Sequence, residues 1–221
     1  MTAKSAKNKP SDKVLRTMKH GEVFTREKEI AEMLSLVDTE VSRLDSRFLE
    51  SACGDGNFLE AIVKARFQRI LTTSNSNYVR MERDVFSSIA SIYGIEILAD
   101  NVESCRNRIY RITDEFLSEN YRGQNGIKIR KAIRYLISLN IVHGDALSLR
   151  QASDPTKPIV FCEWSFVDER LVKRRDFVFR DLVEYELIAA DGLFSDLGEQ
   201  VYIPTPIKEY PLMDFLESSY E

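Results

Sequence analysis

The sequence contains few of the residues that build metal centres and disulfide scaffolds. Its 221 residues include only two histidines, His20 and His143, and three cysteines, Cys53, Cys105 and Cys162, with no CxxC pair. This scarcity argues against a histidine-rich metal centre and a disulfide-dense secreted domain. We therefore predict no metal site, and we interpret the cysteines as reduced thiols of a cytoplasmic protein.

Long apolar runs are also missing. No segment approaches the roughly 20 apolar residues of a membrane-spanning helix, and the first residues lack the apolar core of a signal peptide. The hydrophobic share of 43% and the charged share of 30% are ordinary for a globular protein. We therefore expect one globular domain with small additions and no contact with a membrane.

Charge is distributed unevenly along the chain, although the net charge is only −4. Residues 1–18 are rich in lysine, and we predict a disordered basic arm that is either solvated or in contact with nucleic-acid phosphates. Residues 176–221 are acidic, and only Arg180 and Lys208 oppose the acids there. We therefore divide the chain into the arm (1–18), a main domain (19–165) and an acidic C-terminal extension (166–221) packed on it.

Hydrophobic periodicity in the main domain predicts helices that alternate with short apolar strands. The predicted helices cover residues 25–37, 58–71, 85–92, 100–121 and 127–136, and the predicted strands cover residues 47–50, 93–97, 139–143 and 158–162. This alternation is typical of an α/β fold with a doubly wound, mostly parallel sheet. After Ser165 the pattern weakens, so we expect residues 171–188 to be partly helical and the proline-containing tail to be irregular.

Three loops follow the predicted strands, at the sheet edge where open α/β folds bind ligands. Gly54 and Gly56 flank Asp55 in the first loop, where glycine permits positive φ angles and a close approach of backbone to ligand. Glu96 ends the second strand and can hold ribose hydroxyls. Asp145 ends the third strand and can accept a hydrogen bond from an exocyclic amine, beside Ala146.

In their order, these segments resemble class I S-adenosylmethionine (SAM)-dependent methyltransferases, most closely the adenine-N6 DNA methyltransferases of restriction–modification systems. Residues 48–58 are similar to the glycine motif of that family, 93–103 to its ribose segment, and 141–146 to its adenine segment. Residues 21–25 resemble its "F-T-P" motif, with Arg26 in place of the proline. The resemblance covers residues 21–147 and implies a Rossmann-like methyltransferase sheet.

The resemblance also implies a set of residues that contact the cofactor SAM: Phe24, Thr25, Glu50, Gly54, Asp55, Gly56, Glu96, Ile97, Asp145 and Ala146. In this assignment Asp55 meets the ammonium group of the methionine part and Glu96 holds the ribose hydroxyls. Ile97 packs on the adenine ring, and Asp145 binds the adenine amine.

The family's catalytic motif, Asn or Asp followed by Pro-Pro and an aromatic residue, is missing from the chain. Glu163 and Trp164 stand at the expected position. Either Glu163 accepts the hydrogen bond of the target amine while Trp164 stacks on a flipped base, or Trp164 is a packing residue and methyl transfer is absent or needs another chain. Cys162 follows Phe161 rather than the proline of cytosine-C5 enzymes, which argues against a nucleophilic cysteine.

We therefore expect a methyltransferase-like protein that acts on a nucleic-acid amine, with DNA as the leading substrate and a further protein subunit supplying target recognition. Two alternatives stay open. One is a catalytically silent SAM-binding subunit that regulates or scaffolds a partner, and the other is a methyltransferase for RNA or a small molecule. The C-terminal part is too short for three more strands and a recognition domain, so we expect it to be truncated or atypical.

Overall fold

A computed structural model of the chain describes residues 25–73, 77–183 and 204–220, and within them helices alternate with strands. The elements are α2 (Glu27–Ser35), α3 (Asp38–Ser42), β1 (Phe48–Glu50), α4 (Asn57–Thr73), α5 (Tyr78–Ala90), β2 (Ile92–Glu96), α6 (Ala99–Asn120), α7 (Gly126–Asn140), β3 (Ile141–Asp145), β4 (Arg150–Gln151), β5 (Val160–Phe166), β6 (Leu171–Val178), β7 (Lys208–Glu209), β8 (Met213–Asp214) and the 3-10 helix η2 (Phe215–Tyr220). The α/β class predicted from the sequence is confirmed. The predicted basic arm (1–18) lies outside the described residues.

The first sheet has the order β1-β2-β3-β4, and its first three strands are parallel. Glu50 is paired with Gly94, and Glu96 is paired with His143, so the three parallel strands end at the same edge. The short strand β4 turns back beside β3 in the antiparallel direction. The three loops predicted to bind a ligand therefore follow neighbouring strands.

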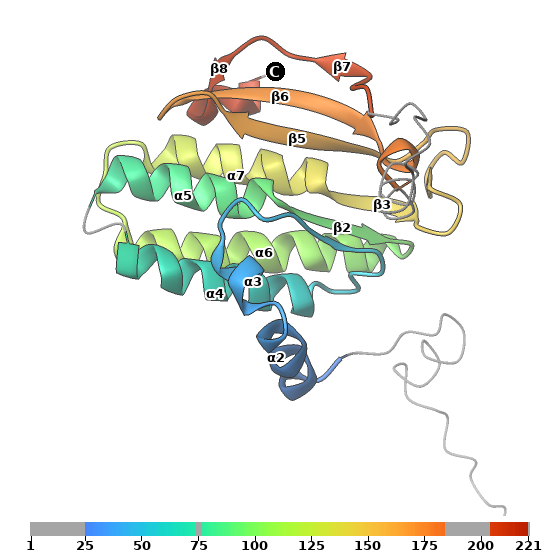
Figure 1. The fold of residues 1–221 in the computed structure, drawn as a ribbon, viewed down its shortest axis with the longest axis horizontal. Coiled ribbons are helices and arrows are strands. Elements are labelled where there is room, and N and C mark those ends of the chain that lie inside the picture. The colour runs from blue at the N-terminus through green and yellow to red at the C-terminus, as the bar shows by residue number, and fades with distance from the viewer. Residues whose placement is uncertain (1–24, 74–76, 184–203, 221) are drawn as a thin grey trace, which may run out of the picture.

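Helices α5 and α7 lead directly into strands of this sheet (Figure 1). Only Ser91 separates α5 from β2, and Asn140 at the end of α7 is followed at once by β3. The Asn140 side chain donates hydrogen bonds to the carbonyls of Ile89 and Ala90, each at 3.2 Å. The two helix–strand junctions are therefore joined by a buried amide.

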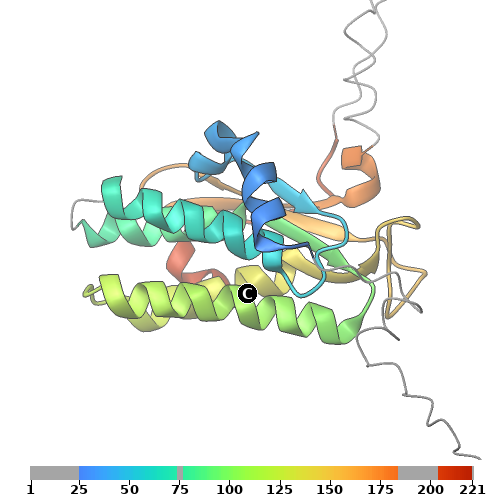
Figure 2. The ribbon, with the colours of Figure 1, turned by 90° about the horizontal axis from the view of Figure 1, so that it is seen from below.

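The molecule is layered (Figure 1). Helices α4 and α6 form one layer, α5 and α7 with the parallel strands form the middle one, and β5 and β6 form the third. Figure 2, which is seen from below, looks onto the α4 and α6 side. The main core lies between the helices and is built from apolar residues at helical spacing, such as Leu59, Ile62, Val63, Phe67 and Ile70 on α4. Burying each such side chain stabilises the fold by about 1.5–3 kcal/mol.

The other face of the parallel sheet is covered by β5 and not by a further parallel strand. Tyr93 on β2 packs against Phe161 with ring centroids 5.0 Å apart, and its hydroxyl donates to the carbonyl of Cys162 at 3.0 Å. Strand β5 pairs only in the antiparallel direction, with β6. The predicted strand at residues 158–162 is therefore present, but it belongs to a second, antiparallel sheet.

Residues 171–188 are partly helical as predicted, because residues 179–183 are helical, but Leu171–Val178 is strand β6. Alternate residues of β6 are buried, among them Arg174 and Asp176, whose side chains pair at 2.8 Å between Nε and Oδ1. Two charged residues on the core face conceal the period of two that identifies a strand. Residues from 184 to 188 lie outside the described part of the chain.

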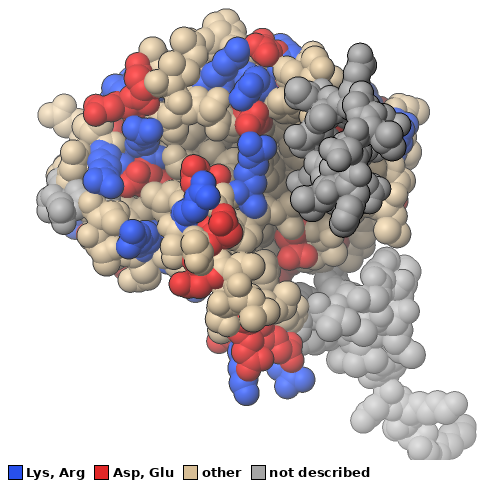
Figure 3. Space-filling model, in the orientation of Figure 1, with Lys and Arg blue, Asp and Glu red and all other residues tan. Residues whose placement is uncertain are grey.

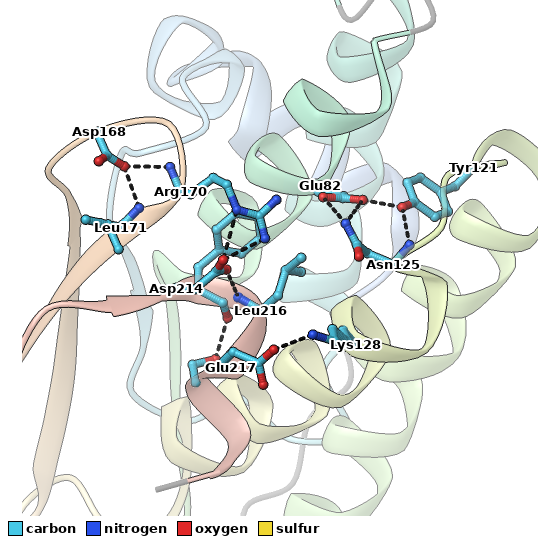
Figure 4. A network of polar contacts seen from close by, with 12 residues as sticks. Glu82, Tyr121, Asn125, Lys128, Asp168, Arg170, Leu171, Asp214, Leu216 and Glu217 are labelled. Atoms are coloured by element: carbon cyan, nitrogen blue, oxygen red, sulfur yellow. Dashed lines mark hydrogen bonds and ion pairs between the residues drawn. The ribbon is translucent and has the colours of Figure 1, made fainter.

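The C-terminal residues 204–220 return to the same body and are not irregular throughout. Strands β7 and β8 pair with β6, and η2 packs on α7. Phe215 and Leu216 are fully buried, and Arg170 binds the Asp214 carboxylate through Nε at 2.9 Å and Nη2 at 2.6 Å (Figure 4). Lys128 on α7 pairs with Glu217 in the same view. The segment thus completes the second sheet and part of the core.

Among the helices that the structure describes, none combines the length and the apolar character that a membrane crossing demands.

Candidate functional site

The glycine loop, residues 53–56, connects β1 to α4 and has the backbone shape that two glycines permit. Gly54 has a φ of 52° and Gly56 a φ of 91°, both in the left-handed region. A Cβ atom on Gly56 would lie 2.7 Å from Cys105 Sγ on α6, whereas a Cβ on Gly54 would meet no atom within 4 Å. The loop is therefore pressed against α6 at Gly56 and open at Gly54.

Glu96 joins the end of β2 to this loop. Its Oε2 accepts the Gly54 amide at 2.9 Å, and its Oε1 accepts the Leu98 amide at 2.8 Å. The residue is only 8% exposed. Each carboxylate oxygen has a further acceptor site, so Glu96 can still receive hydrogen bonds from a pair of hydroxyls.

The end of β3 lies beside the end of β2. His143 Nε2 lies 3.0 Å from the carbonyl oxygen of Ile97, and Asp145 Oδ1 accepts the Leu147 amide at 2.9 Å. Hydrogen bonds from the Ser148 side chain and from the Leu147 amide lower the pKa of Asp145. Two apolar side chains at these strand ends are exposed, Ile97 by 51% and Leu147 by 96%. The edge thus offers a carboxylate beside apolar surface, which suits a flat polar ring.

Asp55 does not have a free carboxylate for a ligand, because Arg108 on α6 binds it. Nη2 of Arg108 lies 2.6 Å from Asp55 Oδ2, Nε donates to the Asp55 carbonyl at 2.8 Å, and Nη1 lies 2.6 Å from Glu60 Oε2. Asn57 also donates to Asp55 Oδ1 at 2.8 Å. Arg108 was not among the residues predicted from the sequence. Its spacing of three residues from Cys105 puts both on one helix face, but only the packing of α6 shows that this face meets the loop.

Glu50 ends β1 beside the glycine loop and is partly buried. Burial raises the pKa of Glu50, and a hydrogen bond from the Ala52 amide partly opposes this shift. Ala146, at the end of β3, packs against the apolar cluster of Tyr93, Ile159 and Phe161 rather than on the open edge.

The N-terminal segment of the predicted site is only partly described. Phe24 lies outside the described residues. Thr25 is exposed, and helix α2 begins after Arg26, whose amide donates to Glu29 Oε2 at 3.2 Å. Among the residues described, no hydrogen bond or ion pair joins Thr25 to the glycine loop.

The two candidate catalytic residues lie away from these loops. Strand β5 follows Ile159, whose side chain would touch a Cβ on Gly144, and ends at Phe166, which packs on Phe86 of α5. Glu163 and Trp164 therefore lie over the beginning of the parallel strands, whereas the glycine loop and Glu96 lie at their ends.

Both candidate catalytic side chains are also engaged in structural contacts. Glu163 Oε1 pairs with Arg47 at 2.9 Å and Oε2 with Arg175 at 3.1 Å. The Trp164 ring packs edge-on against Phe86, with centroids 5.7 Å apart. Burial raises the pKa of Cys162 to about 12, so its thiol stays protonated at neutral pH.

A cavity of about 1040 Å³ opens between α5 and β5, near Glu163 and Trp164. The glycine loop and the ends of β2 and β3 do not line it. Charged residues of both signs line it: Asp45, Arg47, Arg80, Arg83, Asp84, Glu163 and Glu169. Arg80 pairs with Asp84 at 3.6 Å, and Arg47 pairs with Glu163. The balanced lining gives no preference for an anionic or a cationic ligand.

The basic run at residues 172–177 is neutralised by local partners. Lys173 pairs with Glu209 at 2.6 Å, and Arg174 and Arg175 pair with the carboxylates given above. On the face shown in Figure 3, lysine and arginine alternate with aspartate and glutamate. The run is therefore a half-buried strand whose charges are paired, and it offers no phosphate-binding patch of free cations.

No group of three or more His, Cys, Asp or Glu side chains in the described ranges is arranged to hold a metal ion. All three cysteines are buried and free of disulfides. No protein-family model, curated protein or solved structure matches the chain.

Proposed function

We propose that this chain binds S-adenosylmethionine at the carboxyl edge of its parallel strands, as a class I methyltransferase-like protein with a Rossmann-like fold. The observation that carries the proposal is the bond between the Glu96 carboxylate and the Gly54 amide, at 2.9 Å. This bond brings a buried acid directly beside an open glycine turn, which supports a role of Glu96 in holding ribose hydroxyls. A ligand with a ribose and a polar tail fits such a pair of groups.

Two further features support the cofactor. Helix α4 begins at Asn57 immediately after the loop, so its first amides favour the carboxylate of the methionine part. Ile97 and Leu147 expose apolar surface beside Asp145, which suits an adenine ring with its amine on the carboxylate. Glu50 is a second acid near the loop and is available to the cofactor ammonium, because Asp55 is held by Arg108.

The experiment is isothermal titration calorimetry of the full chain with SAM. Glu96→Gln keeps the acceptor for the Gly54 amide, loses the one for the Leu98 amide and removes the charge. We expect the fold to survive with a small loss of stability, and SAM binding to weaken by about tenfold or more. Glu119→Ala, on the exposed end of α6, is the matched control and should bind like the wild type. A wild type without measurable SAM binding would refute the proposal.

For the reaction, we propose a nucleic-acid amine as methyl acceptor, with adenine in DNA as the leading substrate and a cytoplasmic location. A protein partner would supply target recognition. Methyl-tritium transfer from SAM to unmethylated DNA, RNA and protein tests the acceptor class. Labelled DNA is the expected result, and label in RNA alone would reassign the substrate.

A second candidate function, a SAM-binding subunit without methyl transfer of its own, is favoured by the position of Glu163. Arg47 and Arg175 occupy its carboxylate, and β5 carries it away from the glycine loop. In this case SAM binds, no acceptor is labelled by the isolated chain, and labelling appears only after the partner subunit is added.

A further inference from the structure

Arg108 lies outside the predicted cofactor set and makes two hydrogen bonds to Asp55 of the glycine loop. It stands on α6, one turn beyond Cys105, and the two residues share a helix face. Cys105 Sγ lies under Gly56, and the Arg108 guanidinium lies beside Asp55. Helix α6 therefore supports the loop at two consecutive points.

The three hydrogen bonds of Arg108 go to three different parts of the site. Nε donates to the backbone carbonyl of Asp55, Nη2 to the Asp55 carboxylate, and Nη1 to Glu60 in the first turn of α4. A planar guanidinium can make such a fork, and an ammonium cannot. The loop, α4 and α6 are thus fixed to one another through one side chain.

The electrostatics agree with this geometry. Burial alone would raise the pKa of Glu60, but the ion pairs with Lys64 and Arg108 outweigh burial and lower it. Burial opposes the charge on Arg108, yet its bonds to Glu60 and Asp55 raise its pKa. Glu60 is therefore held as a carboxylate, and the same guanidinium binds the Asp55 carboxylate at the start of α4.

We propose that Arg108 is the positioning residue of the glycine loop, which it holds in the cofactor-binding shape before the cofactor arrives. This inference rests on the proposed SAM site. Two glycines with positive φ give the loop many alternative shapes, and ordering it at the moment of binding would reduce affinity. Arg108 orders it in advance, and by occupying Asp55 it also leaves Glu50 as the nearby acid open to the methionine end.

The first test measures the loop without any ligand. Hydrogen–deuterium exchange of the Cys53, Gly54 and Gly56 amides should rise by about tenfold or more in Arg108→Gln, while the amides of α7 keep their protection. Arg111→Gln, one turn further on α6 and exposed, is the matched control. Unchanged exchange of the loop amides in Arg108→Gln would overturn the proposal.

The second test separates positioning from general stability. Arg108→Gln should weaken SAM binding by about tenfold and leave adenosine binding nearly unchanged, because the loop serves the methionine end. Arg108→Lys should recover only part of the loss. Equal weakening for SAM and adenosine, or full recovery by lysine, would contradict the assigned role.

If Arg108→Gln does not fold, Asp55→Asn replaces it in both measurements, since it removes only one side of the pair. If Arg108→Gln does fold, adding Asp55→Asn to it should change the result little, because both changes break the same contact. A wild type that does not bind SAM would refute the cofactor proposal, whereas the exchange result would still decide whether Arg108 holds the loop.

Discussion

The most discriminating stability test replaces the two glycines of the loop one at a time by alanine. At Gly56 the new Cβ would lie 2.7 Å from Cys105 Sγ, at a φ of 91°. Left-handed backbone costs an alanine about 1–2 kcal/mol, and overpacking adds about 1–3 kcal/mol. We expect Gly56→Ala to lower the free energy of unfolding by roughly 2–5 kcal/mol.

Gly54→Ala is the internal control, because its φ of 52° is similar in sign but its Cβ would meet nothing within 4 Å. Its cost should be about 1 kcal/mol. Urea denaturation followed by the fluorescence of Trp164, the only tryptophan, measures both variants. The new methyl group projects into the open side of the loop. Gly54→Ala should therefore reduce the free energy of SAM binding by more than it reduces the free energy of unfolding.

A double-mutant cycle with Cys105→Ala separates the two contributions at Gly56. Removing Sγ relieves the contact and leaves the backbone strain, so the interaction energy should be about 1–2 kcal/mol. The reasoning is refuted if Gly56→Ala costs no more than Gly54→Ala, or if its cost is the same with and without the Cys105 thiol.

Three further predictions follow from the packing. Phe215→Ala removes a fully buried ring that packs 5.2 Å from Phe86 and should cost about 3–5 kcal/mol in urea unfolding, whereas Leu212→Ala, half exposed, should cost less than 1. Burial of the Tyr121 hydroxyl, and to a smaller extent its hydrogen bond to Glu82, raises the pKa of Tyr121 to about 12. The contribution of Tyr121 to the free energy of unfolding should be complete below pH 10 and should be lost as the pH rises through 12. In Tyr121→Phe, the free energy of unfolding should lack this decrease between pH 10 and 12. Glu163→Gln should leave SAM affinity within about twofold of the wild type in calorimetry, and a tenfold loss would place Glu163 in the cofactor site after all.

Sequence periodicity predicted the regular helices well because their cores are plainly apolar. The helices expected at 58–71 and 100–121 are α4 (Asn57–Thr73) and α6 (Ala99–Asn120). Helix α5 begins earlier than expected, at Tyr78, since its first turns contain charged residues. One of them, Glu82, is buried against Tyr121 and Asn125 (Figure 4), and such tertiary pairing is invisible in the sequence.

For the candidate site, the sequence was informative about loops and uninformative about ion pairs. Glu96 and the glycine loop were predicted as separate elements, and the structure joins them by a hydrogen bond. Which cation holds Asp55 depends on how α6 packs on α4, so Arg108 was missed. The position of Glu163 depends on the direction in which β5 crosses the sheet, which no local pattern fixes.

The buried amide of Asn140 has a mechanical consequence. Helix α5 is about 20 Å long and passes into β2 with one residue between them, and α7 passes into β3 with none. The hydrogen bonds of Asn140 hold the two junctions together. Helices α5 and α7 therefore cannot move independently of the strands that end at Glu96 and Asp145. Any tilt of this helix pair must therefore shift the ends of β2 and β3, the two halves of the proposed site, at once.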